Sequence, residues 1–162
     1  MRGHFNHTAQ PSNSIWLWLF PITYALHIVE EVLGGGGYSA YLERLRGIHL
    51  SPIRFMIAQV VGFVLMVLGI FVSRRFKFPN SYCVVLGSVV LVNSLTHTVQ
   101  TFVHREYVPG LVTAVLIWMP LGIATLLRLI GSVKKFRYWM CILAGVAINL
   151  AVELLIISGG SQ

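Results

Sequence analysis

Five apolar stretches alternate with short polar segments along the chain, and each is close to the length that crosses a lipid bilayer as a helix. Their approximate bounds are 14–33, 55–72, 81–103, 111–129 and 138–158. A bilayer core requires about 20 mainly apolar residues of α-helix. The pattern therefore predicts an all-α, polytopic membrane helix bundle of about five transmembrane helices, with residues 1–162 forming a single integral membrane domain.

Composition agrees with this interpretation and narrows the class of protein. The chain is 56% hydrophobic and 10% charged, whereas soluble domains carry about 25% charged residues. The net charge of +7 would suit a nucleic-acid partner. However, the basic residues fall in short clusters between the apolar stretches, which is a topology signal, so we expect no nucleic-acid partner. Cys83 and Cys141 are isolated, and neither a disulfide framework nor a thiolate metal site is expected.

Basic residues are divided unequally between the two predicted sides of the membrane. Eight lie on the side of the N-terminus: Arg2, Arg74, Arg75, Lys77, Arg128, Lys134, Lys135 and Arg137. The opposite side holds four: Arg44, Arg46, Arg54 and Arg105. The positive-inside rule then predicts a cytoplasmic N-terminus and, with five helices, an external C-terminus.

A polar segment of residues 34–54 follows the first stretch and begins with four successive glycines. These glycines let the chain leave the helix at almost any backbone angle. Apolar side chains then recur at near-helical spacing, at Tyr38, Tyr41, Leu42 and Leu45. The spacing predicts a short helix in the membrane interface that would act as a lid. A solvated connector is the alternative.

An imidazole and two carboxylates lie inside the first apolar stretch, at His27, Glu30 and Glu31. Ionisable residues at bilayer depth are costly, rare and usually functional. At about 100° per residue, Glu30 falls about 60° to one side of His27 and Glu31 about 40° to the other. All three side chains are therefore expected on one polar face of the helix.

Polar residues also share a face on the third and fifth stretches. They are Asn93, His97 and Gln100 on the third and Asn149 and Glu153 on the fifth. His27, His97 and Glu153 each lie about 13–17 residues from the predicted cytoplasmic end of their helix, or about 20–25 Å along it. Because the three helices run in the same direction, we expect these groups to meet at one level in the outer half of the bilayer.

Two imidazoles and three carboxylates at one level are a ligand set typical of iron, manganese or zinc. The predicted ligands are His27, Glu30, Glu31, His97 and Glu153. The spacing of His27-x-x-Glu30 is that of di-iron and di-manganese bundles in reversed order, and it also resembles the inverted zinc-protease signature. Divalent ions would balance the carboxylates. The amides predicted to hydrogen-bond the ligands are Asn93, Gln100 and Asn149. One metal and two metals both fit.

Each motif also has a structural interpretation. Glu30 and Glu31 would face water if the first helix ended early. His97 and Asn93 would form a hydrogen-bonded pair between helices, and Glu153 would share a proton as a packing partner.

These motifs together resemble a known family. The residues that carry the resemblance are His27, Glu30 and Glu31, the pair Asn93-x-x-x-His97, and Tyr107-Val108-Pro109-Gly110 before the fourth stretch. The sequence resembles the HXXEE-domain family of small bacterial and archaeal integral membrane proteins over most of the first to fourth stretches. The resemblance implies a membrane architecture and candidate residues but no reaction, because the family's activity is uncharacterised. The assignment of Glu153 rests on its depth alone.

The leading functional hypothesis is a membrane-embedded, metal-dependent enzyme acting on a lipid or other hydrophobic substrate from the outer leaflet. Glu30 and Glu31 are the predicted catalytic carboxylates, because one not fully engaged with metal would act as general base. A carboxylate-bridged di-iron centre would favour oxidation or hydroxylation, whereas a single zinc would favour hydrolysis.

Two other classes stay open. Intramembrane Glu and His residues are typical of proton relays, which favours a proton- or metal-coupled transporter. With five helices, such a transporter would need to form a homodimer. An accessory membrane subunit using the cluster for packing is the third hypothesis. The sequence carries no nucleotide, flavin or haem motif, so no cofactor other than a divalent metal is expected.

Overall fold

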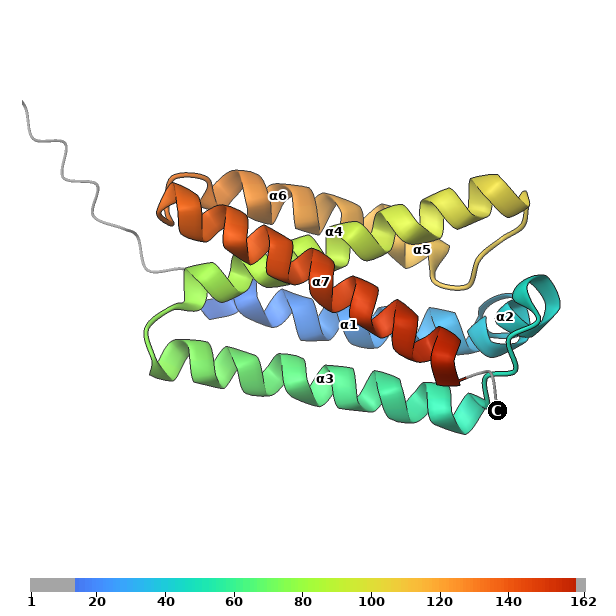
Figure 1. The fold of residues 1–162 in the computed structure, drawn as a ribbon. Helices are drawn as coiled ribbons and strands as arrows, with labels where there is room; N and C mark the ends of the chain where they lie inside the picture. The colour runs from blue at the N-terminus through green and yellow to red at the C-terminus, as the bar shows by residue number, and fades with distance from the viewer. Residues whose placement is uncertain (1–13, 160–162) are drawn as a thin grey trace, which may run out of the picture.

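The computed structural model describes residues 14–159, which form a bundle of long helices with a short helix across one end (Figure 1). The elements in chain order are α1 (Ser14–Leu33), η1 (Gly34–Gly36), α2 (Tyr38–Arg46), α3 (Pro52–Arg75), α4 (Pro79–His104), α5 (Leu111–Thr113), η2 (Ala114–Trp118), α6 (Met119–Leu129) and α7 (Lys135–Gly159). The all-α prediction is confirmed: within this range there is no strand, and five helices are long and apolar enough to cross a membrane.

The observed helices extend the predicted apolar stretches by one to three residues at several ends. Helices α3 and α4 begin with Pro52 and Pro79. Proline suits this position because its fixed φ matches the helix and its missing N–H would have no partner there. Hydropathy does not register these polar or proline-containing first turns, so it places the helix starts too late.

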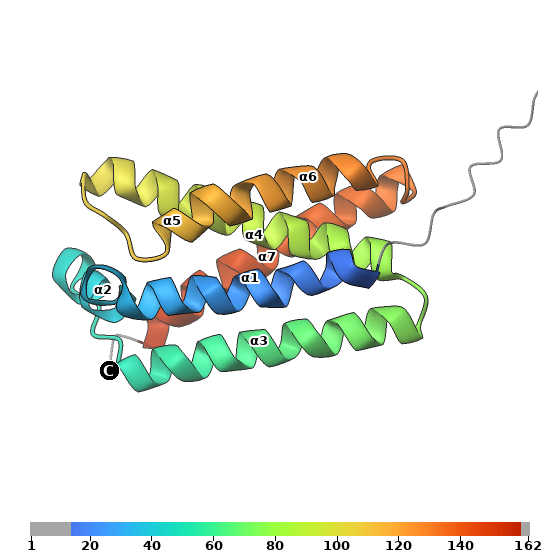
Figure 2. The same ribbon diagram turned by 180° about the vertical axis from the view of Figure 1, so that it is seen from behind.

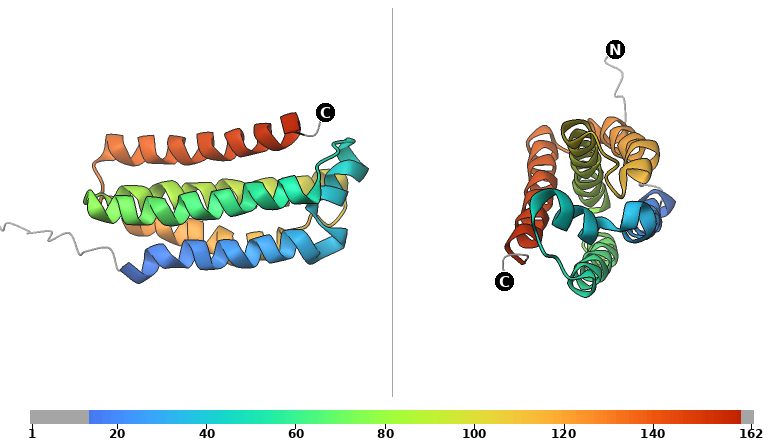
Figure 3. Two further views of the ribbon diagram at one scale, coloured as in Figure 1. Left: turned by 90° about the horizontal axis from the view of Figure 1, so that it is seen from below. Right: turned by 90° about the vertical axis from the view of Figure 1, so that its right-hand side faces the viewer.

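Helix α4 lies in the middle of the bundle and contacts each of the other four long helices, with α7 and the α5–α6 helix packed closely on it (Figures 2 and 3). Small residues allow this close packing. A Cβ at Gly122 of α6 would lie 2.8 Å from the Leu91 Cβ and 2.9 Å from the Gly87 carbonyl of α4. Small residues at such contacts are typical of helix pairs in membranes.

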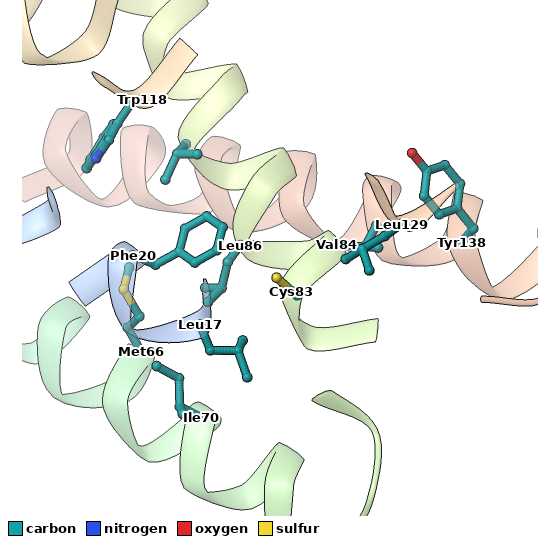
Figure 4. Packing of buried hydrophobic residues seen from close by; sticks show 11 residues of the cluster. Leu17, Phe20, Met66, Ile70, Cys83, Val84, Leu86, Trp118, Leu129 and Tyr138 are labelled. Carbon is teal, nitrogen blue, oxygen red and sulfur yellow. The ribbon is translucent and has the colours of Figure 1, made fainter. Parts of the chain in front are cut away.

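Large apolar side chains fill the half of the bundle that contains the N-terminal end of α1 (Figure 4). Leu17 and Phe20 of α1 meet Met66 and Ile70 of α3, and Cys83 of α4 lies beside them, fully buried. This packed region leaves the polar residues of α1 and α4 to gather in the other half.

The fourth long helix is not a regular α-helix. It passes through a π-helical turn at η2, where the Met119 N–H bonds to the Ala114 carbonyl five residues earlier. Pro120 follows directly and has no N–H to donate. The wider turn accommodates the proline, and such turns are frequent at functional sites. It places Trp118, which is 2% exposed, in the interior of the bundle.

The two ends of the bundle differ in charge as the sequence predicts. The start of α1, the α3–α4 connection and the α6–α7 connection lie at one end (Figure 1). This end holds all the basic residues assigned to it except Arg2, which lies outside the described residues. Arg44, Arg46, Arg54 and Arg105 belong to the end covered by α2.

The segment after the glycines forms the predicted short helix, α2. Tyr38, Tyr41 and Leu42 are buried against Phe55 and Val108. Gly37 has a φ of +92°, and a Cβ there would lie 3.1 Å from the Val32 carbonyl. Glycine is therefore required at the turn that folds α2 back over the bundle.

We predict that Gly122→Leu lowers the free energy of unfolding by about 1–3 kcal/mol, because the larger side chain would push α6 away from α4. Unfolding of the detergent-purified protein in a denaturant titration measures the loss. Ala124→Leu is the matched control, because Ala124 is exposed on the same helix. Equal stability of the two variants would contradict the close packing at Gly122.

Candidate functional site

Three of the predicted residues come together between α1 and α4. Among the residues that the structure describes, His27, Glu31 and His97 form a buried group whose potential metal-ligating atoms all lie within 4.8 Å of one another. The Glu31 Oε1 lies 3.4 Å from the His27 Nε2 and 3.5 Å from the His97 Nε2. His27 and Glu31 share a face because they are four residues apart on α1.

Glu30 points to a different neighbour, the start of the fourth long helix. Its Oε1 accepts hydrogen bonds from the Tyr107 hydroxyl at 2.6 Å and the Val112 N–H at 2.8 Å. Its Oε2 accepts from the Thr113 N–H at 2.7 Å and the Thr113 hydroxyl at 2.5 Å. The first N–H groups of a helix have no partner within the helix. The Glu30 carboxylate supplies that partner, so it is not part of the His27–Glu31–His97 group.

Thr113 connects Glu30 to His27 through its hydroxyl and thereby favours one tautomer of the neutral imidazole. Its hydroxyl has one proton, which it donates to Glu30, so its oxygen can accept from the His27 Nδ1 at 2.7 Å. The proton of a neutral His27 ring is therefore on Nδ1, and Nε2 carries a lone pair. This buried Nε2 has no hydrogen-bond partner and faces the Glu31 Oε1. Two electron-rich atoms thus face each other, an arrangement that a metal ion or an additional proton would stabilise.

A second set of hydrogen bonds holds Glu31. The Gln59 amide of α3 donates to its Oε2, and the Tyr24 hydroxyl donates to the Gln59 Oε1 at 2.6 Å. Gln59 and Tyr24 are not among the site residues predicted from the sequence. The available signal was that Gln59 is the lone polar side chain in the predicted stretch 55–72, and polar residues in membrane helices commonly bond to a neighbouring helix.

Aromatic rings enclose the two imidazoles. Trp118 stacks on His27 with ring centroids 3.8 Å apart, and Tyr38 of α2 lies 5.9 Å from the His97 ring. The rings of His27 and His97 meet edge to face at 5.0 Å. Because His97 is 3% exposed and its Nδ1 has no hydrogen-bond partner, the ring is held mainly by these contacts.

The loop before the fourth long helix passes directly over the group. Gly110 has a φ of +95°, and a Cβ there would lie 2.8 Å from the Cε1 of both imidazoles and 3.0 Å from the Glu31 Cγ. Glycine therefore allows both the turn and the close approach. Tyr107, at the start of this loop, stays protonated because burial and the Glu30 carboxylate raise its pKa to about 12.

The other predicted residues lie around the group at different positions. A cavity of about 90 Å³ beside His27, Glu31 and His97 is lined by Asn93, Asn149 and Glu153. Glu153 does not belong to the three-residue group, although it shares this cavity. The Asn149 Nδ2 donates to the Val89 carbonyl at 3.4 Å, and the Asn93 Oδ1 is buried without a hydrogen-bond partner.

Gln100 lies one turn beyond His97 and bonds elsewhere. Its Oε1 accepts from the Tyr41 hydroxyl at 3.5 Å. The structure thus places this amide against α2 and shows no hydrogen bond between it and either imidazole among the described residues.

A protein family described as "Protein of unknown function with HXXEE motif" matches residues 18–125, more than half of the chain. The chain belongs to this family. The HXXEE match extends from α1 into α6 and contains every residue of the Glu30–Thr113–His27 connection, as well as Glu31, Gln59, His97 and Gly110. Glu153 and Asn149 of α7 lie outside the matched residues. No curated protein and no solved structure matches this HXXEE chain.

We predict that Gly110→Ala destabilises the protein by about 1–3 kcal/mol more than Gly36→Ala. Both glycines have a φ near +90°, so alanine introduces similar backbone strain at each. Only at Gly110 does the new Cβ meet neighbouring atoms, since nothing lies within 4 Å at Gly36. Denaturant titration of both variants measures the difference, and equal losses would contradict the close approach of the loop.

Proposed function

We propose that this HXXEE protein is an integral membrane enzyme that holds one divalent metal ion between His27, Glu31 and His97 and acts on a hydrophobic substrate. The observation that carries the proposal is the buried His27 Nε2, which has no hydrogen-bond partner and lies 3.4 Å from the Glu31 Oε1. Removing such groups from water costs several kcal/mol unless they gain a partner.

The spacing of the donors supports a metal ion in this position. Zinc binds histidine nitrogen and carboxylate oxygen at about 2.1 Å, so two ligands of a tetrahedral ion lie about 3.4 Å apart. The two Nε2–Oε1 distances are 3.4 and 3.5 Å. Two histidines and one carboxylate are also the donor set of non-haem iron(II) sites, and they leave coordination positions for water or substrate.

Neighbouring residues would orient these ligands before metal binds. Thr113 holds His27 with Nε2 free, and Glu30 fixes Thr113. Gln59 occupies the Glu31 Oε2 and leaves Oε1 directed at the imidazoles. Such outer hydrogen bonds set the tautomer and direction of metal ligands. In this proposal Glu30 is therefore a positioning residue, and Glu153 lies on the substrate side of the cavity.

A bound zinc ion would activate water for hydrolysis, whereas iron would support oxidation or hydroxylation. The cluster of basic residues at the end opposite α2 favours a cytoplasmic position for that end. The site would then lie toward the outer leaflet, as its distance along α1 and α4 suggests.

Elemental analysis of the detergent-purified full-length chain tests the proposal. We expect about one iron, manganese or zinc ion per chain in the wild type and its loss in His97→Ala and Glu31→Gln, which each remove a ligand. Glu153→Gln is the matched control and should keep the metal. A well-folded wild type that stays metal-free after incubation with each ion would overturn the proposal.

We predict that Thr113→Val weakens metal affinity by about 10–100-fold, because removing a hydrogen-bond partner of a ligand has effects of this size. Thr113→Ser keeps the hydroxyl and should bind metal almost as the wild type does. Competition with a chelator of known affinity measures both. If valine and serine give the same affinity, the hydroxyl does not orient His27.

A proton-coupled transporter is the second candidate. The observation that favours it is the series Glu30–Thr113–His27–Glu31, in which hydrogen bonds join the first three residues and the His27 Nε2 lies 3.4 Å from the Glu31 Oε1. Such series are typical of proton relays in membranes. Proteoliposomes containing the protein would then dissipate a pH gradient faster than those with Glu31→Gln, and equal rates would exclude this function.

A further inference from the structure

The cavity beside Glu31 extends away from the ligand helices toward α3 and α7. Phe55 and Met66 line it from α3, and Val152 and Glu153 line it from α7. Both helices pack on α4, but the described residues form no extensive contact between α3 and α7. The end-on view shows α3 and α7 as separate helices that lie on different sides of α4 (Figure 3). The cavity therefore lies on the side of the bundle where α3 and α7 are not closely packed on each other.

Side chains on α7 mark the rim of the cavity on this flank. Ile148 and Val152 line the cavity and are nevertheless 46% and 48% exposed. Each thus faces the cavity on one side and the surroundings of the bundle on the other. In a membrane those surroundings are acyl chains, so the rim is an apolar entrance from the lipid.

The size of the cavity limits what can enter. Its volume of about 90 Å³ is enough for several water molecules. A complete lipid does not fit, but a small polar head group does. The hydrocarbon part of such a ligand would stay between α3 and α7, where it replaces lipid contacts at little cost.

The charges and hydrogen-bond acceptors that line the cavity determine which head groups it can bind. It presents the carboxylates of Glu31 and Glu153, and no Lys or Arg is among the described residues that line it. The Asn93 Oδ1 is a buried acceptor without a donor. Unpaired buried acceptors and carboxylates favour a hydrogen-bond donor and disfavour an anion. A phosphate head group is therefore a poor match, whereas a hydroxyl or an amine is a good one.

Tyr38 lines the same cavity as the carboxylates of Glu31 and Glu153. Helix α2, which carries Tyr38, therefore covers this cavity from the end of the bundle.

We propose that the cavity binds the hydroxyl or amine head group of a single-chain amphiphile, which enters from the membrane between α3 and α7 and is held by the carboxylate of Glu153. This inference rests on the proposed function in naming its substrate class. The binding itself does not require the metal ion, so the two proposals can fail separately.

Photo-crosslinking of the full-length chain in lipid nanodiscs tests this entrance. The probe is dodecylamine with a diazirine in its chain, and mass spectrometry locates the label. We expect label on α3 and α7 near Phe55, Met66 and Val152. Val152→Trp should reduce it by about tenfold by filling the entrance. Leu154→Trp, which alters an exposed position outside the cavity lining, should leave it unchanged.

Competition identifies the head group. Dodecylamine and dodecanol should displace the probe, and dodecyl phosphate should not. Glu153→Gln should weaken displacement by dodecylamine about tenfold, as expected for the loss of one charged hydrogen bond, with little effect on dodecanol. Three outcomes would each overturn the inference. Dodecyl phosphate would compete as well as dodecylamine, Glu153→Gln would leave displacement by dodecylamine unchanged, or Val152→Trp and Leu154→Trp would be labelled equally.

Metal content measured on the same samples separates the two proposals. Specific labelling of a protein that stays metal-free after incubation with iron, manganese and zinc would refute the proposed metalloenzyme and support the amphiphile site. Stoichiometric metal with unspecific labelling would do the reverse. If Val152→Trp loses both metal and its cooperative unfolding transition, the Glu153→Gln competition decides the inference alone.

Discussion

The hydrogen bonds between the Glu30 carboxylate and the start of the fourth long helix determine much of the arrangement around the site. A helix N-terminus carries unpaired N–H groups and a partial positive charge, and a carboxylate satisfies both. Here the carboxylate comes from α1, so the two helices are held together at the depth of the site. The same contact fixes the Thr113 hydroxyl and, through it, the His27 ring. Gly110, which precedes this helix start, is thereby held over the imidazoles.

Glu31 is buried and Glu30 is half-buried on a long apolar helix. Polar groups that are shielded from water need a hydrogen-bond partner from the protein. Both glutamates of α1 meet this need, but with different partners: Glu30 takes backbone and hydroxyl donors, whereas Glu31 takes one amide and faces two imidazoles. Two adjacent residues of the same type thus have separate roles, because successive side chains on a helix point in directions about 100° apart.

The fold and part of the candidate site can be predicted from the sequence, because hydrophobic length and helical geometry determine them. Hydrophobic length predicts the five helices, and the equal depth of His27 and His97 predicts that they meet. The separation of Glu30 from Glu31 does not follow from spacing, because it depends on which helix packs against each side of α1. Gln59 and Tyr24 take part in the hydrogen bonds that hold Glu31. Neither residue is charged or belongs to a recognised motif, so the sequence does not single them out. Depth along the helix predicts Glu153 as a ligand beside the imidazoles. Glu153 lines the cavity next to them but lies outside the His27–Glu31–His97 group, because depth alone does not give the distance to the imidazoles.

The π-helical turn at η2 divides the fourth long helix into two parts that contact different helices. The part before it bears Thr113, which contacts His27 and Glu30, and the part after it bears Gly122, which packs against α4. The extra residue in the turn sets the rotation of one part relative to the other. Removing one residue there would turn the parts by about 100°, so Thr113 and Gly122 would no longer reach their partners together. The π-helical turn thus rotates the two parts of the helix relative to each other, so that one part contacts α1 and the other packs against α4, which a regular α-helix of this sequence would not allow.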